Sequence, residues 1–401
     1  MDVDEGDVLK YDVVVIGGGP AGSVAARFAA KGGADVLVLE KRQEIGSPIR
    51  CAEGVSLSWL EELELEDIDS STSRVMKGAI LYSPAGHELK ITEKLAGDEV
   101  GVVLERDHFD KDMARLAVKE GADYMVKTSA VGLIKEDGIV KGVEAKNFGK
   151  RFEVRAELVI GADGYESQVG RWAGIYESLK PKDVMTCFQY RLTGIDMDPD
   201  YTHFYMGSDA PGGYVWVFPK NEDTANVGLG IQFSRLNGSK TPKDYLDEFI
   251  ESHEDYKDGE PVDMVAGAVA VSHPPEKVTA PGILLVGDAS RIVDPMTGGG
   301  IVNGLKQGKI AGEFAVEALN EGRFDEEIMQ RYEERWRDKL ADKLWRNYMA
   351  KETAMQLDDE TFDKIIDALS EIDLETVTIG AILEGVKKKY PELVEEFEDM
   401  I

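Results

Sequence analysis

The chain has 401 residues, among them 77 acidic and 46 basic side chains, and its formal net charge of −31 at pH 7 excludes nucleic acid as a partner. Two cysteines, Cys51 and Cys187, and five histidines exclude a disulfide framework and predict no metal site. No apolar run approaches the ~18 residues of a membrane span and the acidic segment 1–10 is no signal peptide, so we expect a cytoplasmic protein of two or three domains.

The first predicted elements are a strand, a helix and a second strand. The β-branched run 13–16 predicts a buried parallel strand, and a helix is expected from Pro20 to Lys31. Glycines between them permit a tight turn and close approach of the backbone to a pyrophosphate. The small residues of this turn are Gly17, Gly19, Ala21 and Gly22. The second strand, 35–40, ends in Glu40, where a carboxylate accepts hydrogen bonds from a ribose. The unit predicts a dinucleotide site.

The middle of the chain predicts a second sheet. Strands are expected within 77–95, at 122–126, 130–135, 139–145 and 152–160, and a helix at 111–120. Residues 181–275 are rich in Tyr, Phe, Val and Thr, which indicates an antiparallel sheet. The turn 161–164, which contains Asp163, follows a strand and suits either a ligand at the sheet edge or an ordinary turn.

A second glycine-rich segment lies about 270 residues after the first. A buried strand ends at Gly287 and Asp288, whose carboxylate can accept hydrogen bonds from a ribityl chain. Residues 298–304 contain four glycines and begin a helix, so a flavin ring can lie against bare backbone near a positive helix terminus. The two segments together predict FAD, and helical periodicity continues from about 303 to the end.

At this point the chain resembles a known group. The first glycine turn, Arg106 before Phe109 and Asp110, the 161–164 turn and Gly287–Asp288 are similar to FAD proteins of the p-hydroxybenzoate hydroxylase fold. The motif 211–219, followed by Gly228-x-Gly230, resembles the signature of geranylgeranyl reductases. The motif 41–54 resembles the archaeal branch, which saturates the isoprenoid chains of membrane ether lipids. The resemblance covers essentially the whole chain.

The resemblance implies a mixed α/β fold with three parts. These are a Rossmann-type FAD-binding domain (1–75, 100–180 and 276–322), an antiparallel-sheet substrate domain (76–99 and 181–275) and a C-terminal helical domain (323–401). The implied FAD-binding residues are Gly17, Gly19, Ala21, Gly22, Glu40, Cys51, Ala52, Gly54, Arg106, Ala130, Asp288, Gly299, Gly300 and Ile301.

The aromatic motif predicts a substrate wall. Tyr214, Trp216 and Phe218 share one face of a strand and are expected to bind substrate, although core packing is the usual role of such a stripe. Reduction of an isoprenoid alkene needs hydride at one carbon and a proton at the other, so cationic character develops. The proton donor is open among Cys51, Tyr214 and the reduced flavin, and Cys187 is expected to serve packing.

The remaining expectations concern partners and alternatives. The substrate is expected to be a polyprenylated glycerophospholipid, with peripheral contact at the inner membrane face. No second dinucleotide motif exists, so NAD(P)H, a deazaflavin or a ferredoxin is expected to dock transiently. Apolar residues recur at helical spacing in the C-terminal segment, at Trp336, Leu340, Leu344 and Tyr348. We expect them either to line a lipid tunnel or to pack in the core. The alternatives are a flavin monooxygenase or halogenase of the same fold, a quinone-linked electron-transfer flavoprotein, and a non-catalytic lipid carrier. Flavin halogenases carry a Trp-x-Trp-x-Ile-Pro motif, from which this chain departs at Tyr214 and Phe218.

Overall fold

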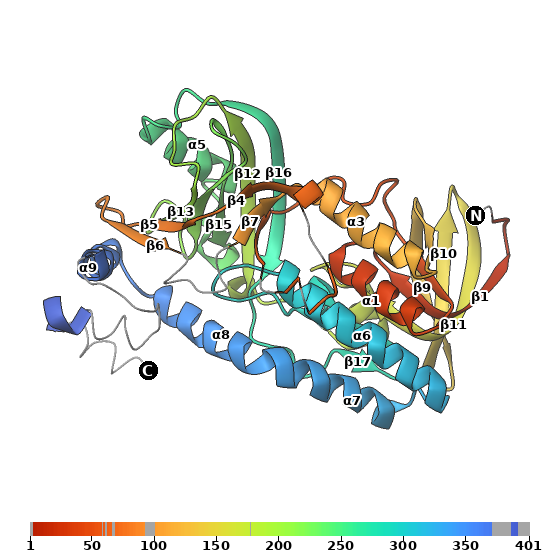
Figure 1. The fold of residues 1–401 in the computed structure, drawn as a ribbon. Coiled ribbons are helices and arrows are strands. Elements are labelled where there is room, and N and C mark those ends of the chain that lie inside the picture. The colour runs from red at the N-terminus through yellow and green to blue at the C-terminus, as the bar shows by residue number, and fades with distance from the viewer. Residues whose placement is uncertain are drawn as a thin grey trace.

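The computed structural model describes residues 3–57, 59–60, 62–65, 69–92, 101–176, 178–370 and 386–391. Within them the chain forms three sheets, which are covered by helices on the FAD-motif side and along the base (Figure 1). The ends of two predictions, the strand region up to residue 95 and the C-terminal helix beyond residue 370, lie outside the described residues.

The first sheet carries the glycine-rich turn. Its central strands β1 (Val8–Ile16), β2 (Val36–Leu39) and β11 (Lys150–Gly161) run parallel, as their buried β-branched sequences predict. Strand order is β17-β18-β11-β1-β2-β8, and β9 and β10 extend it as an antiparallel ribbon from β11. The outer strands are β8 (Asp123–Met125), β9 (Thr128–Glu136), β10 (Ile139–Asn147), β17 (Thr279–Ala280) and β18 (Ile283–Leu285).

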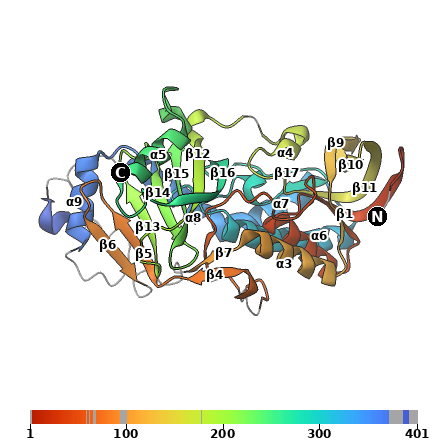
Figure 2. The ribbon, with the colours of Figure 1, turned by 90° about the horizontal axis from the view of Figure 1, so that it is seen from above.

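The second sheet, called the roof sheet below, has the order β16-β12-β15-β14-β13-β5-β6. Its strands are β5 (Gly78–Tyr82), β6 (Glu88–Thr92), β12 (Val184–Thr193), β13 (Tyr201–Met206), β14 (Tyr214–Pro219), β15 (Thr224–Gln232) and β16 (Glu260–Ala270). All neighbouring strands pair antiparallel except β13 and β5, which run parallel. The sequence predicts an antiparallel sheet, and this one pair departs from that prediction. Figure 2 shows β5 and β6 at the opposite end of the molecule from β1 and β11.

A small sheet and several helices join the two large sheets. The small sheet consists of β3 (Gly54–Ser56), β7 (Gly101–Leu104) and β4 (Thr72–Val75). The helices are α1 (Pro20–Lys31), α3 (Arg106–Lys119), α4 (Gln168–Ala173), α5 (Pro242–Ser252), α6 (Ile301–Glu321), α7 (Glu326–Trp336), α8 (Asp342–Ala354) and α9 (Asp359–Ser370). Helix α1 has the predicted bounds, whereas α3 begins at Arg106, five residues before the predicted helix. The mixed α/β fold class is confirmed.

Helices α1 and α6 pack against each other through glycine. A Cβ on Gly308 would lie 2.5 Å from the Ala21 carbonyl oxygen, and one on Gly312 would lie 2.5 Å from that of Ala25. The backbones of the two helices are therefore too close for any side chain between them. This contact brings the start of α6, with its glycine-rich approach, beside the start of α1.

Helices α7 and α8 form one continuous rod along the base of the molecule (Figure 1), joined by a π-helical turn, Arg337–Ala341. The Glu333 carboxylate on α7 accepts hydrogen bonds from Val278 N (2.6 Å) and Thr279 Oγ1 (3.0 Å), so the rod caps the edge of the first sheet. Trp336 and Leu344 are buried in the core of that sheet, which settles their predicted role in favour of packing.

The glycine contact predicts a stability effect. Gly312→Ala should destabilise the fold by about 1–3 kcal/mol, because the added methyl group collides with α1 backbone that cannot move freely. Urea denaturation measures the loss, and Asn320→Ala, on the exposed side of the same helix, is the control. Equal stability of Gly312→Ala and the control would show that α1 and α6 do not need this approach.

Candidate cofactor and substrate site

One large cavity runs between the first sheet and the roof sheet. Its volume is about 2240 Å³, well above the ~300–1,000 Å³ of ordinary ligand pockets, so a cofactor and a second large ligand both fit. Every residue predicted to bind FAD or substrate lines this cavity. These residues are Gly17, Gly19, Ala21, Gly22, Glu40, Cys51, Ala52, Gly54, Arg106, Ala130, Tyr214, Trp216, Phe218, Asp288, Gly299, Gly300 and Ile301.

The three motif glycines do different work. Gly17 has a φ of +109°, and a Cβ there would collide with the Ala162 carbonyl oxygen. A Cβ on Gly22 would collide with the Gly17 carbonyl oxygen. Glycine is required at both positions because any side chain would collide with the protein's own backbone. A Cβ on Gly19, in contrast, has no atom within 4 Å. No contact within the protein requires glycine at position 19, and the open space there faces the cavity, where a ligand can approach the backbone.

Charge complementarity suits a pyrophosphate and a ribose in this region. The N-terminus of α1 has no side-chain cap at Gly19 and no acidic residue in its first turn, so its N–H groups remain open to an anion. The Glu40 carboxylate accepts a hydrogen bond from Gly18 N on Oε2 (2.9 Å) and one from Arg42 N on Oε1 (2.8 Å). These bonds fix the carboxylate at the cavity wall and leave further lone pairs for hydroxyl donors.

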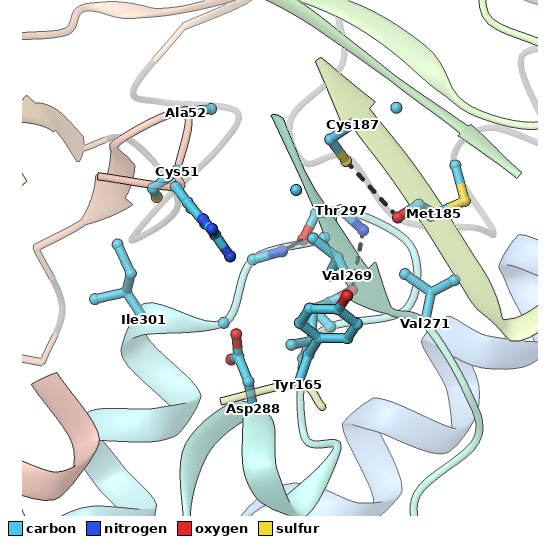
Figure 3. A pocket seen from close by; sticks show the side chains of 18 of the residues that line it. Cys51, Ala52, Tyr165, Met185, Cys187, Val269, Val271, Asp288, Thr297 and Ile301 are labelled. Carbon is cyan, nitrogen blue, oxygen red and sulfur yellow. Dashed lines mark hydrogen bonds between the residues drawn. The ribbon is translucent and has the colours of Figure 1, made fainter. Parts of the chain in front are cut away.

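The second glycine-rich segment faces the first across the cavity. Asp288 points into the cavity from below (Figure 3), and among the described residues no group hydrogen-bonds its carboxylate. Burial raises the pKa of Asp288, while Arg106 opposes that rise. A Cβ on Gly300 would lie 2.8 Å from Asp288 Oδ1, so only glycine leaves room for the carboxylate. A half-buried carboxylate that faces the cavity beside bare backbone fits the ribityl end of a flavin.

Arg106 and Cys51 lie together at the start of α3. The Arg106 guanidinium makes a bidentate pair with Asp110 (2.7 and 2.9 Å), and its positive charge acts on the nearby Cys51 thiol. Burial raises the pKa of the Cys51 thiol, and the nearby positive charge of Arg106 acts in the opposite direction. Across the cavity from Cys51, Cys187 projects from β12 (Figure 3), where burial raises its pKa to about 12. Both thiols are therefore protonated at neutral pH.

The aromatic motif forms a wall under the roof sheet. Trp216 and Phe218 are each 8% exposed, and Phe204 on β13 contacts both Tyr214 and Phe218 at ring-centroid distances of 5.5 and 5.4 Å. We call Phe204, Tyr214, Trp216 and Phe218 the aromatic wall. The Trp216 indole lies over Gly228, where a Cβ would come within 2.6 Å of the ring. The glycine of the Gly-x-Gly motif thus makes room for the indole.

Sequence reasoning missed several residues of the site. Phe204 carries no motif, and only its alternation with Thr202 and Met206, which also line the cavity, signals it. Trp216 Nε1 donates to Gln189 Oε1 (2.8 Å), and Gln189 Nε2 donates to the Cys51 carbonyl oxygen (3.3 Å). Gln189 therefore ties the aromatic wall to the Cys51 loop, a contact that no local pattern predicts.

Of the four residues of the C-terminal helices that the sequence assigns to a tunnel or to the core, only one lines the cavity. Leu340 lines the cavity, whereas Trp336, Leu344 and Tyr348 are buried and absent from its wall. The neighbouring helical face supplies the wall instead, through Lys339, Lys343, Asn347 and Lys351. This stretch of the cavity is consequently more polar than expected.

The open space at Gly19 predicts a selective loss of cofactor. Gly19→Ala should leave the unfolding free energy unchanged and weaken FAD binding about tenfold or more, because a methyl group fills space that the pyrophosphate needs (~1.4 kcal/mol per tenfold). Titration of the apoprotein with FAD, followed by flavin fluorescence, measures the affinity. Gly132→Ala, on β9 with only van der Waals neighbours, is the control. Unaltered FAD affinity in Gly19→Ala would place the cofactor elsewhere.

Comparisons with known proteins agree with this geometry. The model of the geranylgeranyl reductase catalytic domain matches residues 183–269, and that of FAD-dependent oxidoreductases matches residues 12–187. The digeranylgeranylglycerophospholipid reductase of Thermoplasma volcanium is 48% identical over 393 residues, which cover 98% of this chain and 99% of that protein.

Solved structures show the same relationship. A crystal structure described as a geranylgeranyl bacteriochlorophyll reductase-like protein from Thermoplasma acidophilum has a TM-score of 0.92 at 46% identity, covering 98% of this chain and 100% of that one. A myxobacterial chondrochloren halogenase has a TM-score of 0.71 at 17% identity, over 95% of this chain and 97% of that one, and shares the fold alone. The chain belongs to the digeranylgeranylglycerophospholipid reductase family and is an FAD-dependent oxidoreductase.

Proposed function

We propose that this protein saturates the carbon–carbon double bonds of the geranylgeranyl chains in digeranylgeranylglycerophospholipids, a step of membrane lipid biosynthesis. The observation that carries the proposal is the continuity of one cavity from the glycine turn to the aromatic wall. A long apolar chain can therefore lie along the roof sheet while one of its double bonds lies at the flavin position.

The chemistry sets the demands on the protein. Bound FAD, when reduced, supplies the hydride. An isoprenoid double bond is electron-rich, so a proton must reach one carbon as hydride reaches the other. The aromatic wall excludes water and presents negative ring faces to the developing positive charge. Gln189 holds the Trp216 indole in place through the Nε1 hydrogen bond.

We assign the proton to Cys51 Sγ ahead of Tyr214. Burial keeps the Cys51 thiol protonated at neutral pH, and Arg106 beside the sulfur stabilises the thiolate that remains after transfer. Tyr214 also stays protonated, because burial raises its pKa, but its hydroxyl group donates to the Thr297 carbonyl oxygen. That bond would have to break before Tyr214 could serve the substrate.

The reductant and the membrane contact complete the proposal. A transient donor, NAD(P)H, a deazaflavin or a ferredoxin, is proposed because the chain carries one dinucleotide motif only. None of the described helices is both long and apolar enough to cross a bilayer. Since the substrate is a lipid, we propose that the protein works in the cytoplasm, peripherally at the inner membrane face.

An anaerobic half-reaction tests the function. The purified yellow protein is reduced with dithionite and mixed with digeranylgeranylglycerophospholipid, while flavin absorbance and product mass are followed. Lipid-dependent reoxidation, with a gain of two hydrogens per saturated bond, is expected. A flavin that stays reduced until O₂ and an aromatic compound are added would instead indicate a monooxygenase or halogenase. Tight lipid binding without reoxidation would indicate a carrier.

The assigned proton donor is tested by a cysteine pair. Cys51→Ala should keep FAD bound and slow lipid reduction at least ~100-fold, the lower range for loss of a general acid. Cys187→Ala, which removes the other cavity thiol, should retain most activity. Stopped-flow flavin reoxidation measures both rates. Wild-type reoxidation in Cys51→Ala would exclude the thiol and leave Tyr214 and the reduced flavin itself as the candidates.

A further inference from the structure

Glu53 occupies an unusual position two residues after Cys51. Its side chain is 1% exposed, and its φ of +75° lies in the left-handed region, which a non-glycine residue adopts only under strong local constraint. The residue stands at the junction of the Cys51 loop, the start of α3 and the roof sheet. A buried carboxylate in a strained backbone conformation needs compensating partners.

Four donors, from α3, β12, β15 and the turn between β14 and β15, converge on this carboxylate. Glu53 Oε1 accepts from Arg106 N at the start of α3 (2.9 Å). Glu53 Oε2 accepts from Asn226 Nδ2 (2.7 Å) and Arg191 Nη2 (2.9 Å) and forms an ion pair with Lys220 Nζ (2.6 Å). Lys220 is 7% exposed and Asn226 is 1% exposed. Side chains of the roof sheet and of the turn after β14 thus meet at the Glu53 carboxylate.

The backbone of the same residue contacts the thiol. Glu53 N donates to Cys51 Sγ (3.2 Å), and the Glu53 carbonyl oxygen accepts from Leu104 N (2.9 Å). Asn226 Nδ2 also donates to the Ala52 carbonyl oxygen (3.1 Å). Residues 51–53 are therefore held on both sides, by the roof sheet and by the small sheet.

We propose that Glu53 is a positioning residue that holds Cys51 Sγ beside Arg106 and makes the placement of the thiol depend on the docking of the roof sheet. The proposal rests on the proposed function only for its catalytic consequence. The placement itself is a property of the described contacts. A thiol held in this way stays shielded and protonated until the roof sheet moves, whereas a loosely held loop would expose it.

Thiol labelling of the FAD-loaded protein tests the proposal independently of lipid turnover. Iodoacetamide labelling of Cys51 and Cys187 is followed separately by peptide mass spectrometry across pH. In Glu53→Gln, the Cys51 labelling midpoint should fall by about one pH unit, which raises its rate about tenfold below the midpoint, because burial and the Glu53 charge both raise the thiol pKa. Cys187 on β12 should be unchanged.

The control is Asp200→Asn. Asp200 pairs with Arg74 Nη2 (3.0 Å) on β4 and so joins the small sheet to the roof sheet, without contacting residues 51–53. Asp200→Asn should leave the labelling rates and midpoints of Cys51 and Cys187 at their wild-type values. Asn226→Ala keeps the Glu53 charge but removes two hydrogen bonds to residues 51–53. It should lower the Cys51 labelling midpoint by a smaller amount than Glu53→Gln does. If Glu53→Gln does not fold, Asn226→Ala alone tests the proposal.

Two results would overturn the proposal. The first is a wild-type Cys51 midpoint in Asn226→Ala and in any Glu53→Gln protein that folds. The second is equal acceleration of Cys51 and Cys187, which would mean general loosening. Where Cys51 alone responds and the lipid half-reaction is absent from the wild type, the positioning stands and the proposed function fails.

Discussion

The site depends on the absence of side chains between α1 and α6. The segments that form its two sides are about 270 residues apart in the sequence, and Gly308 and Gly312 bring them together by allowing α6 to lie directly on the α1 backbone. Gly17 and Gly22 allow the glycine-rich turn to pack tightly at the start of α1. The turn, the start of α6 and Asp288 therefore line one cavity. Close packing transmits such constraints because the interior cannot absorb an added methyl group without shifting its neighbours.

The roof sheet is attached by buried ion pairs in addition to a small apolar cluster, in which Trp216 and Phe218 pack against Val103 of the small sheet. The core of the roof sheet and that of the first sheet are separate clusters, and polar side chains cross between them near Cys51. Removing one partner of a buried ion pair leaves an uncompensated charge at a cost of several kcal/mol. The attachment is thus specific in its geometry. It also lies beside the reacting region, where a lipid has to enter between the two parts.

Local chemistry predicts the elements of this fold better than their partners. The bounds of α1, the end of β2 directly before Glu40 and the face shared by Tyr214 and Trp216 all follow from short-range pattern. The parallel pairing of β5 with β13 joins segments more than 100 residues apart, and no local signal encodes it. Gln189 belongs to no sequence motif, and Glu53 lies in the motif 41–54, whose pattern gives no sign of the contacts that its carboxylate makes with the roof sheet. Domain bounds and the roles of individual site residues stay predictions.

The π-helical turn at Arg337–Ala341 also bears on how such cavities diverge. A π turn holds one more residue than an α turn, and each residue rotates a helix by roughly 100°. Loss of a single residue there would return the turn to α geometry and leave α7 docked on the first sheet, with the face of α8 that carries Lys343 and Asn347 still toward the cavity. A chain that gains or loses this one residue therefore keeps the same polar stripe in its cavity wall.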